Sequence, residues 1–388
     1  RESMAETAGK KKKRKPRRFY DYSLLFTIIF LTVFGLIMIY SSSSYNAQIH
    51  GQSASYYMKR QGYIALAGFA LMLVISKIDY HFFARFTFLS IIISYVCMIL
   101  VDFTSLGIEV NGKKRWLGTR TVRFQPTELV KVTVILVLAV VITKLGKEIN
   151  ELRSWLMIAA LILPLALLVT INNLSSGIII CGIAFVMMFI ACKKKWPFVA
   201  VAAVMVCGVL FALPIAQACV KIGLLQGYQL NRILVWKNPE AYPKDGGYQV
   251  LQGLYAIGSG GLLGKGLGQS IQKLSFLPEP QNDMIFAIIC EELGLFGAVS
   301  VILIFLFMIY RFMLIAGNAP DLFGALLVIG VMAHISIQVI LNIAVVTNVI
   351  PNTGITLPFI SYGGTSVLFL MIEMGMVLSV SNQIKLEK

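Results

Sequence analysis

Charged residues, histidine and closely paired cysteines are scarce in this sequence. Asp, Glu, Lys and Arg make up 13% of the 388 residues, which is about half of their usual share in a soluble domain. The three histidines are far apart and the six cysteines show no paired short spacing. Neighbouring residues therefore cannot assemble a zinc cluster or a disulfide framework. The composition excludes a soluble domain and predicts no metal site made of protein ligands.

Hydrophobic residues dominate instead, since they form 57% of the chain and the mean hydropathy is +0.80. Apolar stretches near the roughly 20 residues that cross a bilayer recur from residue 22 onward. They lie at residues 22–43, 61–78, 83–102, 127–145, 155–172, 176–192, 196–219, 284–314, 321–347 and 355–381. The pattern predicts an all-α polytopic membrane protein of about ten transmembrane helices, in one membrane domain that covers residues 22–381.

The net charge of +16 includes a run at residues 10–18 in which every residue except Pro16 is basic. Such a run can bind nucleic acid, but directly before a long apolar helix it is typical of a cytoplasmic tail near anionic lipid. Basic residues in the short loops of the same predicted side agree with this orientation. We therefore expect no nucleic-acid partner and two cytoplasmic tails, residues 1–21 and 382–388, in which residues 1–3 ahead of Met4 are interpreted as an expression scar.

One predicted outer loop, residues 111–123, breaks the rule that basic loops stay inside. It contains Lys113, Lys114, Arg115, Arg120 and Arg123. Positive charge held outside against the insertion bias suits a surface that binds an anion such as a phosphate. The alternative is a solvated loop that touches lipid headgroups.

A second outer loop, residues 221–283, is expected between the seventh and eighth helices. Within it Leu251, Leu254, Tyr255 and Ile257 recur near helical spacing, and a glycine-rich run follows at residues 258–268. This predicts a short amphipathic helix lying on the membrane, followed by a tight loop. A loop of this length is usually functional or disordered, and its aromatic and aliphatic content argues against disorder.

Acidic residues that could act as acid or base on the outer side are few enough to name: Asp102, Glu109, Glu128, Glu240, Asp245, Glu279, Asp283, Glu291 and Glu292. Asp283 stands out because it ends the stretch FLPEPQND and precedes the apolar run MIFAII. A half-buried carboxylate there would have a raised pKa and accept protons near neutral pH. An Asp at this place could equally be a helix N-cap.

Other polar residues interrupt predicted membrane helices, where they are costly and usually paired or functional. Glu128 and Lys131 share one helical face and could form an ion pair or a site. Glu373 has no obvious partner in the sequence. The segment at residues 348–369 mixes prolines and glycines with Ser361 and Tyr362. Such non-helical backbone would border a cavity, although a packing kink would leave the same pattern.

Three long motifs allow a comparison with a known family. GKKRWLGTRTVRFQPTELVK, GGYQVLQGLYAIGSGGLLGKGLGQSIQKLSFLPEPQNDMIFAIICEELG and PNTGITLPFISYGGTS occur in this order. Together they resemble the SEDS (shape, elongation, division and sporulation) proteins over nearly the whole chain. GLGQSIQK and the opening YDYSLLF are more similar to the division branch, FtsW, than to the elongation branch, RodA.

The resemblance implies a ten-span peptidoglycan glycosyltransferase of the bacterial plasma membrane. It would polymerise lipid II, the undecaprenyl-pyrophosphate-linked disaccharide peptide, at the outer face, together with a class B penicillin-binding transpeptidase and other division proteins. The alternatives are a lipid II flippase, an elongation or sporulation polymerase, and a non-catalytic scaffold.

The resemblance also implies the site residues. The aspartate of the LPE-x-x-x-D motif, the catalytic carboxylate, corresponds to Asp283. Candidates for substrate binding are Arg115, Trp116, Gln125, Glu128, Lys131, Gln249, Lys273, Glu279, Ser361 and Tyr362. The chain departs from the family in having Gln281 and Asn282 in place of His-Thr, and in having NNLSS at residues 172–176 in place of PDLGT, which removes a carboxylate.

The expected reaction is an inverting displacement in which Asp283 takes the proton of the acceptor sugar's 4-hydroxyl while its oxygen attacks the donor's anomeric carbon. Arg115, Lys131 and Lys273 would stabilise the departing lipid pyrophosphate. A divalent cation could assist at the pyrophosphate, and no other cofactor is expected.

Overall fold

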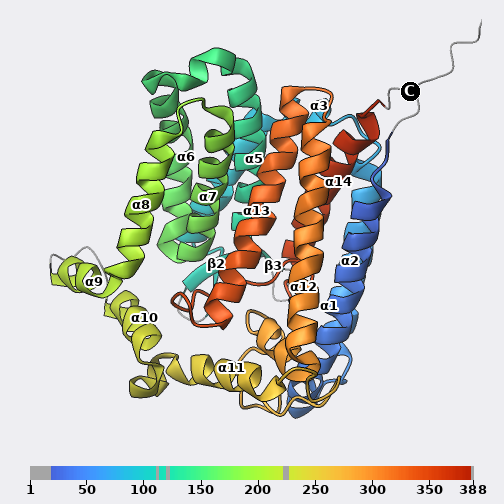
Figure 1. The fold of residues 1–388 in the computed structure, drawn as a ribbon, viewed down its shortest axis with the longest axis vertical. Helices are drawn as coiled ribbons and strands as arrows, with labels where there is room; N and C mark the ends of the chain where they lie inside the picture. Colours follow the sequence, from blue (N-terminus) through green and yellow to red (C-terminus); the bar gives the residue numbers. More distant parts are fainter. Residues whose placement is uncertain (1–18, 111–112, 119–122, 222–226, 386–388) are drawn as a thin grey trace, which may run out of the picture.

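The computed structural model describes residues 19–110, 113–118, 123–221 and 227–385, which fold into a bundle of helices (Figure 1). Among the described residues, eight helices are long and apolar enough to cross a membrane: α1 (Tyr22–Ile49), α2 (Tyr56–Ile75), α5 (Pro126–Leu145), α6 (Leu152–Asn172), α7 (Leu174–Ala191), α12 (Ile285–Gly317), α13 (Leu322–Val346) and α14 (Thr365–Gln383). Two shorter apolar helices are α4 (Thr87–Phe103) and α8 (Trp196–Leu210). The predicted polytopic helical fold is confirmed, and the count of about ten spans, which needs both short helices, stays a prediction.

The remaining elements lie between these helices. They are α3 (His81–Arg85), α9 (Ala212–Lys221), α10 (Gly227–Lys237), α11 (Gly247–Gly260), 3-10 turns at Gly146–Asn150, Pro239–Ala241 and Pro243–Asp245, and strands β1 (Gly107–Val110), β2 (Lys113–Gly118) and β3 (Arg123–Phe124). The strands form a small antiparallel sheet in the order β1-β2-β3, so the basic loop at residues 111–123 contains β2 and the first residue of β3. Its residues 111–112 and 119–122, Arg120 included, lie outside the described residues, as do the predicted tails at residues 1–18 and 386–388 and residues 222–226 of the second loop.

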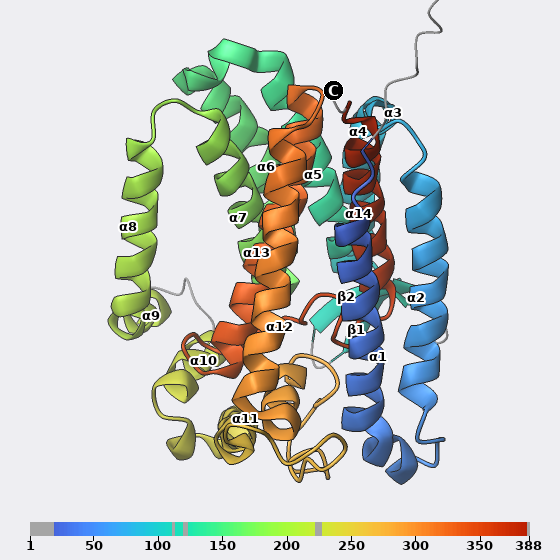
Figure 2. The same cartoon turned by 45° about the vertical axis from the view of Figure 1, so that its right-hand side comes forward.

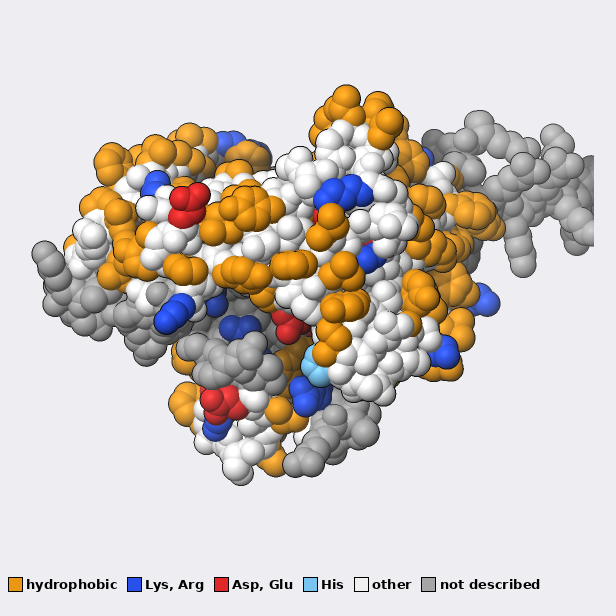
Figure 3. All heavy atoms as spheres, turned by 90° about the horizontal axis from the view of Figure 1, so that it is seen from below, with side chains coloured by type: hydrophobic (Ala, Val, Ile, Leu, Met, Phe, Trp, Pro, Cys, Tyr) orange, Lys and Arg blue, Asp and Glu red, His pale blue; other side chains and the backbone are white. Residues whose placement is uncertain are grey.

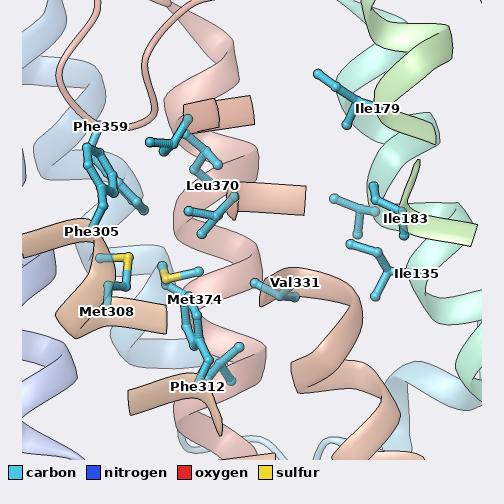
Figure 4. Close-up of a cluster of buried hydrophobic side chains, with 14 of the residues drawn as sticks. Ile135, Ile179, Ile183, Phe305, Met308, Phe312, Val331, Phe359, Leu370 and Met374 are labelled. Carbon is cyan, nitrogen blue, oxygen red and sulfur yellow. The ribbon is translucent and has the colours of Figure 1, made fainter. Parts of the chain in front are cut away.

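The centre of the bundle is formed by α5, α13 and α14. In α14, 67% of the apolar stretch is buried, against 28% in α12, which is peripheral. Side chains from different helices meet in this core (Figure 4). The labelled ones are Ile135, Ile179, Ile183, Phe305, Met308, Phe312, Val331, Phe359, Leu370 and Met374. Close packing makes such an interior rigid, so polar groups that project from α13 and α14 are held in fixed positions.

Helix α12 is broken near its N-terminal end, where Gly294 has a left-handed φ of 66°. The glycine-rich loop after α11 fills the break: Lys265 donates its backbone N–H to the Glu291 carbonyl at 2.9 Å, and Leu295 donates to the Gly261 carbonyl at 2.9 Å. A Cβ on Gly260 would lie 1.9 Å from the Cys290 carbonyl oxygen, so only glycine permits this approach. The freed backbone groups of α12 are thus satisfied within the protein, as a membrane requires.

Three predicted spans differ from the observed helices. The expected span 83–102 divides at Phe86 into α3 and α4. The expected span 196–219 divides at Phe211 into α8 and α9, because Pro214 has no N–H and its ring clashes with the carbonyl of Leu210, four residues earlier. The expected span 355–381 becomes helical only at Thr365, since the segment before it contains Pro358 and glycines with positive φ. In the second loop, the predicted helix is observed as α11, and α10 was not predicted.

The two ends of the described chain lie together. The N–H of Phe19 donates to the Ile384 carbonyl at 3.0 Å, which agrees with an even number of crossings. The small sheet, α10 and α11 all lie toward the opposite end of the bundle (Figures 1 and 2). The residues predicted to bind substrate on the outer side therefore gather at one end of the molecule.

Candidate active site at the outer end of the bundle

Asp283 lies at the junction of the long loop that precedes α12 and α12 itself. The N-cap position of α12 is Met284, and no side chain caps that end. Asp283 is thus not the helix cap that the sequence allowed, and its carboxylate has no structural bond to the helix that follows. A half-buried carboxylate without a capping role is available for chemistry.

The surroundings of Asp283 perturb its carboxyl group. Burial raises its pKa to about 6, repulsion from Glu279 adds to this, and a hydrogen bond from Gln249 and the positive charge of Arg232 act in the opposite direction. A Cβ placed on Gly354 would lie 3.7 Å from the Asp283 Oδ2 atom, so the glycine leaves one side of the carboxylate open. A carboxylate with a pKa near 6 is a stronger base than an ordinary aspartate and is still ionised at neutral pH.

The segment between α13 and α14 lies against Asp283, as we expected from its prolines and glycines. Asn352 donates its side-chain amide to Gln249 Oε1 at 3.2 Å, and Arg232 Nη1 donates to the Asn352 carbonyl at 3.1 Å. Ser175 at the start of α7 donates its hydroxyl to the Thr353 carbonyl at 2.7 Å. Three helices, α7, α10 and α11, therefore hold this segment beside the carboxylate.

The basic sheet reaches the same region through the connection between α6 and α7. Arg115 of β2 donates its Nε–H to the Asn172 carbonyl at 2.9 Å. Trp116 pairs with Ile108 across the sheet and is half-buried. Asn172 is three residues from Ser175, which contacts the segment beside Asp283. Seen from this end, basic and acidic side chains lie around a hollow in the middle of the face (Figure 3).

Glu128 and Lys131 form the ion pair that their spacing allowed. Their charged atoms are 2.9 Å apart, and the residues are 7% and 2% exposed. Lys131 Nζ also donates to Gln338 Oε1 at 3.3 Å. Gln125 occupies the N-cap position of α5 without making a side-chain cap and remains partly exposed. The pair is therefore built into the wall of the bundle, whereas Gln125 can still reach a ligand.

Lys273 is not brought to Asp283. It is 6% exposed, and its Nζ donates to Glu292 Oε1 at 2.8 Å and to Ser41 Oγ at 3.0 Å. The neighbouring Glu291 is paired in a similar way with Lys265 at 2.7 Å. These two buried glutamates hold the glycine-rich loop on α12, so Lys273 stabilises the loop in this conformation and does not face the site.

The other predicted substrate residues take different positions. Ser361 is 2% exposed, and its Oγ accepts the N–H of Leu357 at 2.8 Å, which makes it a turn residue. Tyr362 is half-buried, and its N–H donates to the Gln281 carbonyl at 2.9 Å. Glu279 is exposed near Asp283 and accepts a hydrogen bond from Asn282. Of these, Tyr362 and Glu279 border the site.

Several residues of the site were missed by sequence reasoning. Arg232 belongs to α10, which was not predicted. His334, Gln338 and Asn342 all lie on one face of α13, four residues apart, and are 1%, 5% and 0% exposed. A polar stripe inside a membrane span is a functional signal, and this spacing could have revealed it.

The described residues contain no group of three or more His, Cys, Asp and Glu side chains that could hold a metal ion.

Comparison with known proteins places these features in a wider group. The family described as "Cell cycle protein" (FtsW, RodA, SpoVE) matches residues 22–386. Stage V sporulation protein E of Bacillus subtilis is 37% identical over 360 residues, which cover 92% of this chain and 95% of that protein. The probable peptidoglycan glycosyltransferase FtsW of Trichlorobacter lovleyi is 34% identical, with 96% of each chain covered. FtsW of Bacillus subtilis is 36% identical, with 96% of this chain and 93% of that one covered.

Solved structures share the fold. A chain from a structure described as "Structural coordination of polymerization and crosslinking by a peptidoglycan synthase complex" superposes with a TM-score of 0.75 at 24% identity, and 93% of this chain and 97% of that one are covered. Thermus thermophilus rod shape determining protein RodA gives a TM-score of 0.68 at 22% identity, with 95% and 98% covered.

Proposed function

Since this chain belongs to the FtsW, RodA and SpoVE family of cell cycle proteins, we propose that it is a peptidoglycan glycosyltransferase that polymerises lipid II. The observation that carries this proposal is Asp283, a half-buried carboxylate with a pKa near 6 at the outer end of a membrane bundle. The names of its relatives, probable peptidoglycan glycosyltransferases, support the reaction class.

In the proposed reaction Asp283 accepts the proton of the 4-hydroxyl of the acceptor sugar. The freed oxygen attacks the anomeric carbon of the donor, the bond to the lipid pyrophosphate breaks, and the anomeric configuration inverts. Arg115 and Arg232 would balance the charge of the departing pyrophosphate, since arginine binds phosphate oxygens in a bidentate manner. Their hydrogen bonds to the carbonyls of Asn172 and Asn352 support this role, because Asn352 belongs to the segment beside Asp283 and Asn172 precedes Ser175, which contacts that segment. The buried ammonium of Lys131 on α5 would add to this positive charge. We no longer assign Lys273 to the pyrophosphate, because it pairs with Glu292.

We further propose that the protein lies in the bacterial plasma membrane with both termini in the cytoplasm, works with a class B penicillin-binding transpeptidase, and serves cell division. The relatives named FtsW support the division role. Stage V sporulation protein E is 37% identical, against 34% and 36% for the two FtsW proteins, which makes sporulation the alternative. A divalent cation bound together with the pyrophosphate would assist its departure.

The test is polymerisation of labelled lipid II by the purified full chain in detergent, with and without the transpeptidase. We expect Asp283→Asn to reduce glycan formation by about a hundredfold or more, while Glu240→Gln, which alters an exposed outer carboxylate, keeps full activity. Because detergent offers no compartment to cross, a lipid flippase would form no glycan in this assay. A well-folded Asp283→Asn protein that still polymerises would refute the assignment of the base.

A further inference from the structure

A chain of buried hydrogen bonds runs from the middle of α14 to the segment beside Asp283. Glu373 Oε2 lies 2.8 Å from His334 Nδ1, and His334 Nε2 lies 2.9 Å from Gln338 Oε1. Gln338 Nε2 donates to the Thr356 carbonyl at 3.0 Å. Glu373, His334 and Gln338 are 0%, 1% and 5% exposed. These three side chains are therefore closed to solvent.

The donor and the acceptor of each hydrogen bond in this series follow from the groups at its two ends. Lys131 can only donate and the Thr356 carbonyl can only accept, so Gln338 must turn its oxygen to Lys131 and its amide to Thr356. The same oxygen faces His334, so Nε2 of this histidine must carry a proton. Its Nδ1 then faces Glu373, and one further proton is shared between them.

Charge balance supports this assignment. Glu128 and Lys131 neutralise each other, which leaves Glu373 as the remaining buried carboxylate of the connected group. An unpaired buried charge is very costly, so either His334 is an imidazolium or Glu373 is protonated. In both states the bond between them holds the ring with its Nε2–H pointing at Gln338.

The segment held by Gln338 also contacts the base. Asn342, one helical turn further along α13, uses its amide to donate to the carbonyl of Ile355 at 2.6 Å and to the carbonyl of Asp283 at 2.9 Å. Both hydrogens of this amide are thereby used. Gln338 and Asn342 together fix residues 354–356 against Asp283, because adjacent carbonyls are tied to one rigid helix.

We propose that His334, oriented by Glu373, is a positioning residue that fixes Gln338 and, through residues 354–356, the placement of the Asp283 carboxylate. This inference deepens the proposed glycosyltransferase function and rests on it. Neither His334 nor Glu373 touches the reacting atoms. Their effect is to hold the base in productive geometry, where a displacement of about 1 Å can cost a hundredfold in rate.

Two substitutions of His334 separate this role from simple packing. A glutamine amide reaches as far as Nε2, so His334→Gln can still donate to Gln338. An asparagine amide reaches only as far as Nδ1, so His334→Asn contacts Glu373 and leaves Gln338 without its donor. We expect His334→Gln to keep kcat within about threefold, and His334→Asn to lower kcat by about tenfold to a hundredfold with KM for lipid II little changed.

A second measurement detects placement of the base directly. If residues 354–356 become less ordered, water reaches the Asp283 carboxylate and its pKa falls. The pH at which the polymerisation rate is half-maximal should then fall below 6 in His334→Asn. Glu279, Arg232 and Gln249, the other groups that face Asp283, are unaltered in this variant. A lower folded fraction would reduce the amplitude without moving the midpoint. Glu373→Gln, which can still hydrogen-bond Nδ1, should resemble the wild type, and Glu373→Leu should resemble His334→Asn.

Equal kcat values and an unmoved midpoint in both His334 variants would overturn the positioning role, as would equal losses in both. If the wild type itself forms no glycan, the proposed function fails, and the pH dependence of dicyclohexylcarbodiimide labelling at Asp283, read by mass spectrometry, still decides the inference. The labelling midpoint should then fall in His334→Asn and not in His334→Gln.

Discussion

At the scale of single residues, the raised pKa of Asp283 has consequences for both activity and stability. As the proposed base, Asp283 is mostly ionised above its pKa of about 6, so polymerisation should rise with pH through about 6 and level off above this value. The folded state binds this proton more tightly than the unfolded chain, whose Asp pKa is 3.8. The ionised group therefore lowers stability at neutral pH, and the penalty disappears as the pH falls toward 4.

Asp283→Asn should accordingly be more stable than the wild type at pH 8, by roughly 1–3 °C in melting temperature, and the difference should shrink at pH 5. Thermal unfolding in detergent measures this, with Glu240→Gln as a variant that should not depart from the wild type. A destabilised Asn variant at pH 8 would mean that the carboxylate is a structural acceptor and not a strained base.

At the scale of elements, the glycine-rich loop and the broken helix α12 depend on each other. The loop supplies backbone donors and acceptors to the break at Gly294, and Glu291 and Glu292 anchor it through Lys265 and Lys273. These ion pairs and backbone hydrogen bonds hold the loop that ends at Asp283 against α12. The stability of the fold and the position of Asp283, the proposed base, are coupled because both depend on the Lys265–Glu291 and Lys273–Glu292 pairs.

Lys273→Met should therefore lower the free energy of unfolding by about 3–5 kcal/mol, since it leaves the buried Glu292 carboxylate without a cationic partner and with neutral donors from Ser41 and Ser270 alone. Lys265→Met is the matched control and should cost less, because the Lys265 side chain is 28% exposed whereas that of Lys273 is 7% exposed, so water can partly replace the lost ammonium at Glu291. Adding Glu292→Gln to Lys273→Met should restore most of the loss. Unchanged stability with weakened lipid II binding would return Lys273 to the substrate site.

At the scale of the whole molecule, the end opposite the candidate active site is stabilised by a histidine that pairs with two aspartates. His81 lies between Asp79 and Asp321, with its ring nitrogens 2.7 and 2.6 Å from their carboxylates. Burial would lower the pKa of His81, but the hydrogen bonds and charges of Asp79 and Asp321 raise it above 6.5. This histidine connects the segment after α2 to the start of α13, the helix that also carries Gln338 and Asn342.

A raised histidine pKa stabilises the fold below its unfolded value, near 6.5, and the contribution is lost as pH rises through the folded value. His81→Gln should therefore melt at a lower temperature than the wild type at pH 6, and at nearly the same temperature at pH 9. His50→Gln, at an exposed histidine with no carboxylate partner in the described structure, should show no such pH dependence. A deficit of equal size at both pH values would assign His81 to packing alone.

The sequence by itself determined the class of the fold and the main candidate for the base. Membrane helices follow from the length and hydropathy of continuous stretches, which are local properties. Asp283 was found because an acidic residue at the border of a polar loop and an apolar span is half-buried wherever the span packs. The motifs around it also carried the resemblance to the family.

Only the tertiary structure decided which polar residues meet. Lys273 was expected at the substrate and instead pairs with Glu292 and Ser41, the latter 232 residues away in sequence. Glu373 had no partner in the sequence and has His334 in the fold. Pairings between distant residues depend on which helices become neighbours and at what depth, and burial then penalises every polar group that finds no partner. No spacing within one helix contains that information.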